Sequence, residues 1–188
     1  MDDEPQRPPI VLAFAGPNGS GKTTVKRGLP AFGTYINADD LKKEYNLTDL
    51  EAVQQAEAVR SKLLNRRADF SFETVLSTKR NLLFLQKAKA SGYEVQCIYV
   101  LTCNENINVA RVRARRASGG HDVPEEKIRS RYHSALSLLP RLIEVCDKIL
   151  VYDNTDIPSL IFSKENAYWE YFPNYHWSEA ALKKLLGL

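Results

Sequence analysis

The stretch IVLAFAGPNGSGKTT, residues Ile10–Thr24, decides the fold of this chain. It begins with an apolar run and continues into GPNGSGKT, residues 16–23, which has the spacing of a phosphate-binding P-loop. The three glycines of the loop allow backbone angles that residues with a Cβ resist, so successive amide N–H groups can converge on phosphate oxygens. The stretch therefore predicts a buried strand, a loop that binds a nucleoside triphosphate, and a helix whose positive dipole end faces the same anion.

The positions of this loop have separate expected roles toward ATP. We expect Lys22 to bridge the β- and γ-phosphates and the Thr23 hydroxyl to hold Mg²⁺. A glycine-rich turn with no ligand is the alternative, but the full motif between an apolar strand and a helix disfavours it. The residues predicted to bind the nucleotide are Gly16, Asn18, Gly19, Ser20, Gly21, Lys22, Thr23 and Thr24.

The composition is that of an ordinary globular protein with one α/β domain. The 188 residues carry a net charge of only +3, which gives no case for a membrane or nucleic-acid surface. No apolar run approaches the roughly 20 residues that span a bilayer. The three cysteines lack metal-binding spacing, and we expect a reducing cytoplasm. Cys97 lies in an apolar run and is expected to be a small core residue. Residues 1–9, acidic and proline-rich, are expected to be a disordered lead-in to a single domain over residues 10–188.

Strands and helices are expected to alternate along most of the chain, which predicts a mainly parallel sheet of about five strands with helices on both faces. A hairpin from residue 158 and a short helix capped by Ser178 follow the last parallel strand. Thr48 and Glu51 resemble a capping box, which predicts a helix start at that point. The expected parallel strands cover residues 10–15, 35–38, 70–74, 94–102 and 148–152. The fold class is thus α/β, of the P-loop kinase type.

Carboxylates follow two of the short strands and are expected beside the P-loop, because ligands gather at the carboxyl ends of parallel strands. Asp39 is the expected general base for an acceptor hydroxyl, and Asp40 the expected N-cap of a following helix, although the two roles are interchangeable on sequence alone. Glu73 and Thr74 are expected to bind the substrate. The alternative for Glu73 is an ordinary surface carboxylate at a strand end.

An arginine-rich segment over residues 111–132 is expected to form a lid. Arg111 and Arg115 are four residues apart and share a helix face, and Arg131 lies on the returning helix beyond Gly119 and Gly120. We expect Arg111 to contact ATP, and Arg115 and Arg131 to stabilise charge on the transferring phosphoryl group. A solvated basic face is the alternative, and we adopt it for the neighbouring arginines at positions 113 and 116.

Several motifs in this order resemble the zeta toxin family, and more closely its short stand-alone branch: GPNGSGKTT, INADD, FSFETVLS, ARVRARRASGGHDVPEEKIRSRY and VYDNT. The resemblance implies a P-loop kinase that phosphorylates a sugar hydroxyl of UDP-N-acetylglucosamine, with an antitoxin protein as a partner. It places the family's P-loop lysine at Lys22, its catalytic aspartate at Asp39 and its substrate-positioning glutamate at Glu73. The lid arginines fall near Arg115 and on Arg129 or Arg131.

The leading hypothesis is an ATP-dependent kinase acting on a hydroxyl of a UDP-sugar or a similar small metabolite. Two alternatives stay open: a P-loop ATPase that acts as a binding module, and a polynucleotide 5′-kinase. A nucleic-acid partner is disfavoured because the basic residues cluster at one lid and form no long stripe.

Overall fold

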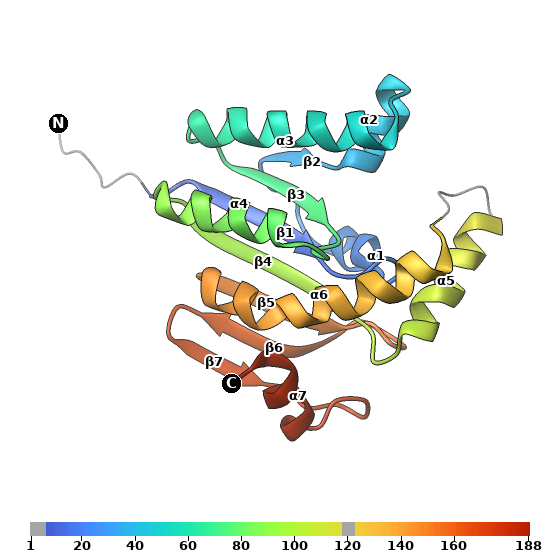
Figure 1. The fold of residues 1–188 in the computed structure, drawn as a ribbon. Helices are drawn as coiled ribbons and strands as arrows, with labels where there is room; N and C mark the ends of the chain where they lie inside the picture. The colour runs from blue at the N-terminus through green and yellow to red at the C-terminus, as the bar shows by residue number, and fades with distance from the viewer. Residues whose placement is uncertain (1–6, 118–122) are drawn as a thin grey trace.

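A computed structural model of the chain describes residues 7–117 and 123–188 (Figure 1). The helices and strands follow each other in the order β1 (Ile10–Ala15), α1 (Lys22–Arg27), β2 (Thr34–Ile36), α2 (Ala38–Tyr45), α3 (Asp49–Asn65), β3 (Phe70–Thr74), α4 (Lys79–Ala90), β4 (Glu94–Leu101), α5 (Glu105–Ala117), α6 (Glu125–Val145), β5 (Lys148–Asp153), β6 (Ser159–Glu165), β7 (Tyr168–Tyr171) and α7 (Glu179–Leu186). Of the expected lead-in, residues 1–6 lie outside the described residues. Arg7, in contrast, pairs with Asp69, and the Pro9 carbonyl accepts a hydrogen bond from the Glu94 amide.

The described strands form one sheet in the order β2-β3-β1-β4-β5-β6-β7. The first five of these are parallel, and β6 and β7 continue the sheet in antiparallel fashion. The predicted mainly parallel α/β sheet is thus confirmed, and the expected hairpin is the antiparallel edge of that same sheet. The P-loop strand β1 lies between β3 and β4, so the loop emerges at the centre of the carboxyl edge.

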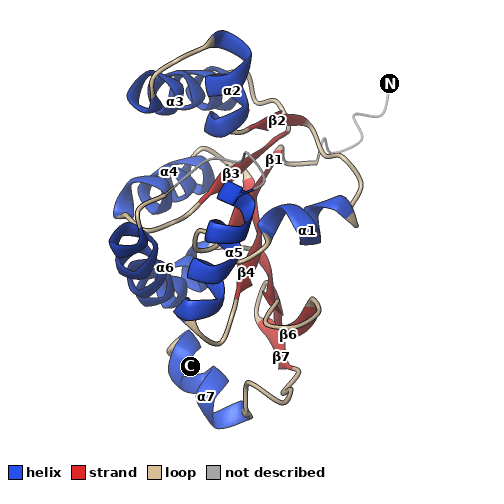
Figure 2. Ribbon diagram, turned by 90° about the vertical axis from the view of Figure 1, so that its right-hand side faces the viewer, coloured by secondary structure: helices blue, strands red, loops and turns tan. Residues whose placement is uncertain are grey.

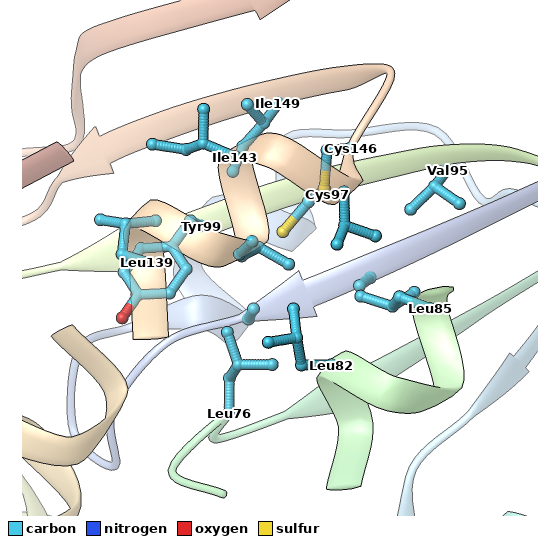
Figure 3. Packing of buried hydrophobic residues seen from close by; sticks show 14 of the residues in the cluster. Leu76, Leu82, Leu85, Val95, Cys97, Tyr99, Leu139, Ile143, Cys146 and Ile149 are labelled. Atoms are coloured by element: carbon cyan, nitrogen blue, oxygen red, sulfur yellow. The ribbon is translucent and has the colours of Figure 1, made fainter. Parts of the chain in front are cut away.

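The two faces of the sheet are covered unequally. Figure 2 shows α3, α4, α6 and α7 on one face and α1 on the other. The main core lies on the first face, where Leu85 of α4 and Leu139 of α6 are fully buried against the strands (Figure 3). Cys97, expected as a small core residue, is buried there beside Cys146. A smaller cluster under α1 contains Val25.

The segment after β2 differs from the sequence-based expectation. β2 ends at Ile36, and the two aspartates lie in the first turn of α2, a helix that the sequence analysis expected to begin only after Asp40. Asn37 caps this helix, because its side-chain oxygen accepts a hydrogen bond from the Asp39 amide at 3.0 Å. The expectation that Asp40 is the cap was therefore wrong, and both aspartates instead place negative charge at a helix N-terminus, where the helix dipole favours it.

Two further expectations concern the lid and the membrane. Gly119 and Gly120, the expected hinge of the lid, lie outside the described residues, so the lid stays a prediction. Among the helices that the structure describes, none is both long enough and apolar enough to cross a bilayer.

The capping box at the start of α3 generates a stability prediction. Thr48 accepts a hydrogen bond from the Glu51 amide, and the Glu51 carboxylate accepts one from the Thr48 amide at 2.8 Å. We expect Thr48→Ala to lower the free energy of unfolding by about 0.5–2 kcal/mol, measured by denaturant titration. Thr78→Ala is the matched control, since Thr78 occupies the N-cap of α4 but its side chain accepts no capping hydrogen bond. Equal losses in the two variants would contradict the role of the box.

Candidate active site

The P-loop backbone is in close contact with two other segments, and glycine is required at both contacts. A Cβ at Gly19 would lie 2.4 Å from the Asn108 carbonyl oxygen, and one at Gly21 would lie 2.0 Å from the Asn154 side-chain nitrogen. Both glycines also have positive φ, at +76° and +88°. The loop can therefore adopt this shape only without side chains at these positions.

Two asparagine side chains hold the loop in this shape. The Asn108 amide of α5 donates to the Asn18 carbonyl at 2.6 Å, and the Asn154 amide after β5 donates to the Ser20 carbonyl at 2.8 Å. Thr102 donates to the Asn108 side-chain oxygen and so fixes the orientation of that amide. Neither asparagine was identified from the sequence as a site residue. A signal existed for Asn108, which is three and seven residues before two of the lid arginines and therefore on their helix face.

Lys22 lies folded back on its own loop. Its ammonium group donates to the Gly16 and Pro17 carbonyls at 2.9 and 3.2 Å and lies 3.8 Å from a Glu73 carboxylate oxygen. Burial lowers the pKa of Lys22, and the charges of Glu73 and Asp39 oppose that shift. The lysine is thus a buried cation held by carbonyl dipoles and flanked by two carboxylates.

The predicted residues Asp39, Glu73 and Thr74 line one cavity of about 490 Å³ together with Lys22. Asp39 follows β2 and Glu73 lies on β3, and these two strands are neighbours in the sheet. Of the two neighbouring aspartates, Asp39 lines the cavity and Asp40 is not among its described lining residues. The Thr74 hydroxyl accepts from the Leu76 amide and from the Asn81 side chain at 3.0 and 2.7 Å, which fixes the end of β3.

The arginines of the expected lid divide into two groups. Arg115 and Arg131 line the cavity, and the Arg131 guanidinium lies 3.4 Å from the Asn18 side-chain oxygen of the P-loop. Arg129 instead forms ion pairs with Glu105 and Glu125, both at 2.8 Å, so Arg131 is the better candidate of the two alternatives.

Arg111 lies apart from the cavity lining. Its guanidinium donates to the Asn154 and Thr155 carbonyls at 2.7 and 2.9 Å, in the segment that also holds the P-loop. Contact of Arg111 with ATP stays a prediction. In this geometry Arg111 holds the loop after β5 in position.

The remaining P-loop residues differ in their exposure. Thr23 and Thr24 are exposed in the first turn of α1, where ligand oxygens can reach their hydroxyls. The Ser20 hydroxyl is buried and has no hydrogen-bond partner in the part of the chain that the structure describes.

The model of the family described as "Zeta toxin" matches residues 1–166. The chain belongs to the zeta toxin family. A Haemophilus influenzae protein, described only as uncharacterized, is 30% identical over 128 residues, which cover 65% of this chain and 91% of the relative.

Two solved structures show a similar fold. A chain of the AvrRxo1-ORF1:AvrRxo1-ORF2 crystal structure with sulphate ions superposes with a TM-score of 0.73 at 14% identity, covering 95% of this chain and 63% of that one. A chain of the PezAT toxin–antitoxin system of Streptococcus pneumoniae gives a TM-score of 0.58 at 19% identity, covering 99% and 86%. The zeta toxin chain thus spans less than two thirds of the AvrRxo1 chain that it matches.

The hydrogen bonds from Asn108 and Asn154 to the P-loop carbonyls, here called the asparagine clamp, lead to the next prediction. Asn154→Ala leaves the Ser20 carbonyl without its donor inside the protein, which typically costs about 1–3 kcal/mol of folding free energy. We also expect weaker ATP binding, because the loop loses one of its two side-chain supports. Denaturant titration and calorimetric ATP titration measure the two effects. Asn65→Ala, at an exposed position of α3, should leave both unchanged; an Asn154→Ala protein with normal ATP affinity would show that the clamp is dispensable.

Proposed function

We propose that this zeta toxin family member is an ATP-dependent kinase that transfers the γ-phosphate to a hydroxyl of a UDP-sugar, similar to UDP-N-acetylglucosamine, or of a similar small metabolite. The observation that carries the proposal is one cavity whose lining brings together the P-loop lysine, two carboxylates and two arginines. These residues are Lys22, Asp39, Glu73, Arg115 and Arg131. An ATPase that acts only as a binding module needs no acceptor carboxylates in that place.

The chemistry assigned to each group follows from its charge and position. Asp39 accepts the proton of the acceptor hydroxyl while that oxygen attacks the γ-phosphorus and the bond to ADP breaks. Lys22, Arg115 and Arg131 stabilise the negative charge of the transferring group. Glu73 and Thr74 orient the acceptor so that the reacting atoms are aligned.

ATP and Mg²⁺ fit the residues at the loop. An AvrRxo1-ORF1:-ORF2 structure that superposes with a TM-score of 0.73 contains ATP, which supports ATP as the donor here. The described residues contain no group of three or more His, Cys, Asp or Glu side chains that could hold a metal ion by itself. Mg²⁺ commonly binds through one or two protein ligands plus substrate phosphates. The exposed Thr23 hydroxyl suits that mode, in which the ion neutralises phosphate charge.

The charge of the cavity supports an anionic acceptor. Its lining carries more basic than acidic side chains: Lys22, Lys42, Arg60, Arg80, Arg115, Lys127 and Arg131 against Asp39, Asp49, Glu57 and Glu73. The excess comes from Lys22 and from Arg115, Lys127 and Arg131 of α5 and α6. On α3 and at the start of α4 the lining is balanced, with Arg60 and Arg80 against Asp49 and Glu57.

Arg60 of α3 is the most informative of these basic residues. Its guanidinium is buried 4.6 and 4.9 Å from the ring centres of Phe72 and Phe84, and its Nε has no hydrogen-bond partner among the described residues. Its carboxylate neighbour Glu57 is 3.7 Å away and also pairs with Arg80 at 2.7 Å. Arg60 also donates to the Asn81 side-chain oxygen at 2.8 Å. A ligand anion would add negative charge beside this buried cation, which shares Glu57 with Arg80.

The adjacent N-terminus of α4 also favours a negatively charged ligand group. Its N-cap side chain makes no capping hydrogen bond, and its first turn contains no acidic residue of its own, so the carboxylate beside this turn is Glu57, which pairs with Arg80. The diphosphate of a nucleotide sugar matches this end of the cavity in charge.

The family also suggests a protein partner. PezAT is by its own description a toxin–antitoxin system, and we propose an antitoxin partner for this chain, with the reaction in the cytoplasm. A chain of the Pnkp1/Rnl/Hen1 RNA repair complex has a TM-score of 0.58 at 19% identity, covering 73% of this chain and 47% of that one. A polynucleotide 5′-kinase is therefore kept as an outcome of the experiment below.

The decisive experiment measures the mass of the acceptor after incubation with ATP and Mg²⁺. Wild-type protein should add one phosphate to a UDP-sugar. Lys22→Ala should abolish transfer, and Asp39→Asn should lower it by roughly 10²–10⁴-fold while ATP still binds, because Asn cannot accept the proton. Steady ATP hydrolysis with no phosphorylated UDP-sugar would favour the ATPase alternative, and phosphorylation of an oligonucleotide 5′-end would favour the polynucleotide kinase.

The proposed anionic acceptor has its own test. Arg80→Gln should raise KM for the acceptor on the order of 10-fold with little change in kcat, because a charge-assisted contact to the bound acceptor is lost in ground and transition state alike. Lys79→Gln is a matched control, since it removes one charge from the same helical turn at an exposed residue outside the described cavity lining. Equal effects of both variants would mean that general charge, and not a contact at Arg80, attracts the acceptor.

A further inference from the structure

A continuous chain of hydrogen bonds runs from the backbone amide of Asp39 through Asn37 and Tyr35 to the Glu73 carboxylate. The Asp39 amide donates to the Asn37 side-chain oxygen at 3.0 Å, and the Asn37 side-chain nitrogen donates to the Tyr35 hydroxyl oxygen at 3.3 Å. That hydroxyl lies 3.0 Å from a Glu73 carboxylate oxygen. Tyr35 is not among the described residues that line the cavity, and neither it nor Asn37 was singled out in the sequence.

The direction of these bonds is determined by their chemistry. The Tyr35 oxygen accepts from Asn37, so its single hydrogen is available for Glu73, which as a carboxylate can only accept. Burial, followed by the charge of Glu73, raises the pKa of Tyr35 far above its ordinary value. The hydroxyl therefore stays protonated at neutral pH and donates to Glu73.

The tyrosine ring is itself held on the face of the sheet that α1 covers. It meets the Phe14 ring of β1 edge-on at 6.4 Å, and the Lys26 ammonium of α1 lies 2.9 Å from its centre. Tyr35 thus contacts the strand before the P-loop and the helix after it. Its hydroxyl has little freedom to leave Glu73.

We infer that Tyr35 and Asn37 are positioning residues that set the separation and orientation of Asp39 and Glu73. The inference rests on the proposed function, in which these carboxylates act on one acceptor. One Glu73 oxygen is bound by Tyr35, and the other lies 3.8 Å from Lys22. Without the hydroxyl, Glu73 is free to rotate toward the lysine and away from the acceptor. Asn37 couples the same hydroxyl to the first turn of α2, which carries Asp39.

Tyr35→Phe tests this with the ring retained. We expect kcat/KM for the acceptor to fall on the order of 10-fold, the loss expected for one hydrogen bond to a charged group. The dissociation constant of ATP, measured without acceptor, should change less than about twofold, because no Tyr35 atom belongs to the P-loop. Tyr152→Phe is the matched control, since Tyr152 packs against the same apolar cluster and is not a described lining residue of the cavity. Equal losses for both variants would overturn the inference.

A double-mutant cycle separates positioning from general stability. If Tyr35 acts through Glu73, Tyr35→Phe should shift the denaturation midpoint in wild type but hardly at all in a Glu73→Ala background. This readout needs no substrate. Should wild type phosphorylate no UDP-sugar, the proposed function fails, and the cycle still decides whether Tyr35 and Glu73 are coupled. Additive shifts would refute the coupling even if the kinase is active.

Discussion

The P-loop is held by contacts that leave no room for a side chain. A Cβ on any of its glycines at positions 16, 19 and 21 would come within 2.0–2.4 Å of Val100, Asn108 or Asn154. Two of these neighbours also donate side-chain hydrogen bonds to loop carbonyls. Steric exclusion and hydrogen bonding therefore act at the same points, and amide groups that must converge on phosphate are preorganised by the rest of the fold.

The sequence alone predicted the parts of this arrangement that depend on local pattern. The P-loop motif, the parallel sheet, the Thr48 capping box and the burial of Cys97 follow from spacing and hydrophobicity, and the structure contains them. The start of α2 was missed because INADD offers three side chains that can cap a helix. Only the tertiary structure shows that the first of them, Asn37, has the extended backbone of a cap.

The supports of the site were harder to predict because they depend on contacts between distant segments. Asn108 and Asn18 are separated by 90 residues, and Asn154 and Ser20 by 134. Nothing in the local sequence distinguishes Asn154 from a surface asparagine, and only its helical spacing from the lid arginines marked Asn108. The same holds for two arginines of α6, Arg129 and Arg131, which the sequence could not tell apart as candidates. In the structure Arg129 forms ion pairs with Glu105 and Glu125, whereas Arg131 lines the cavity.

The strand order also has a consequence for how the chain folds. The P-loop is synthesised near the beginning, but its neighbours β3 and β4 begin at Phe70 and Glu94, and its last support is Asn154. Contacts of such long sequence separation form late, because the entropy of closing the intervening loops must be overcome first. The nucleotide site is therefore completed only after most of the chain has been ordered. A nascent chain that already contains the whole motif still lacks the site, so binding competence reports on the folding of the entire sheet.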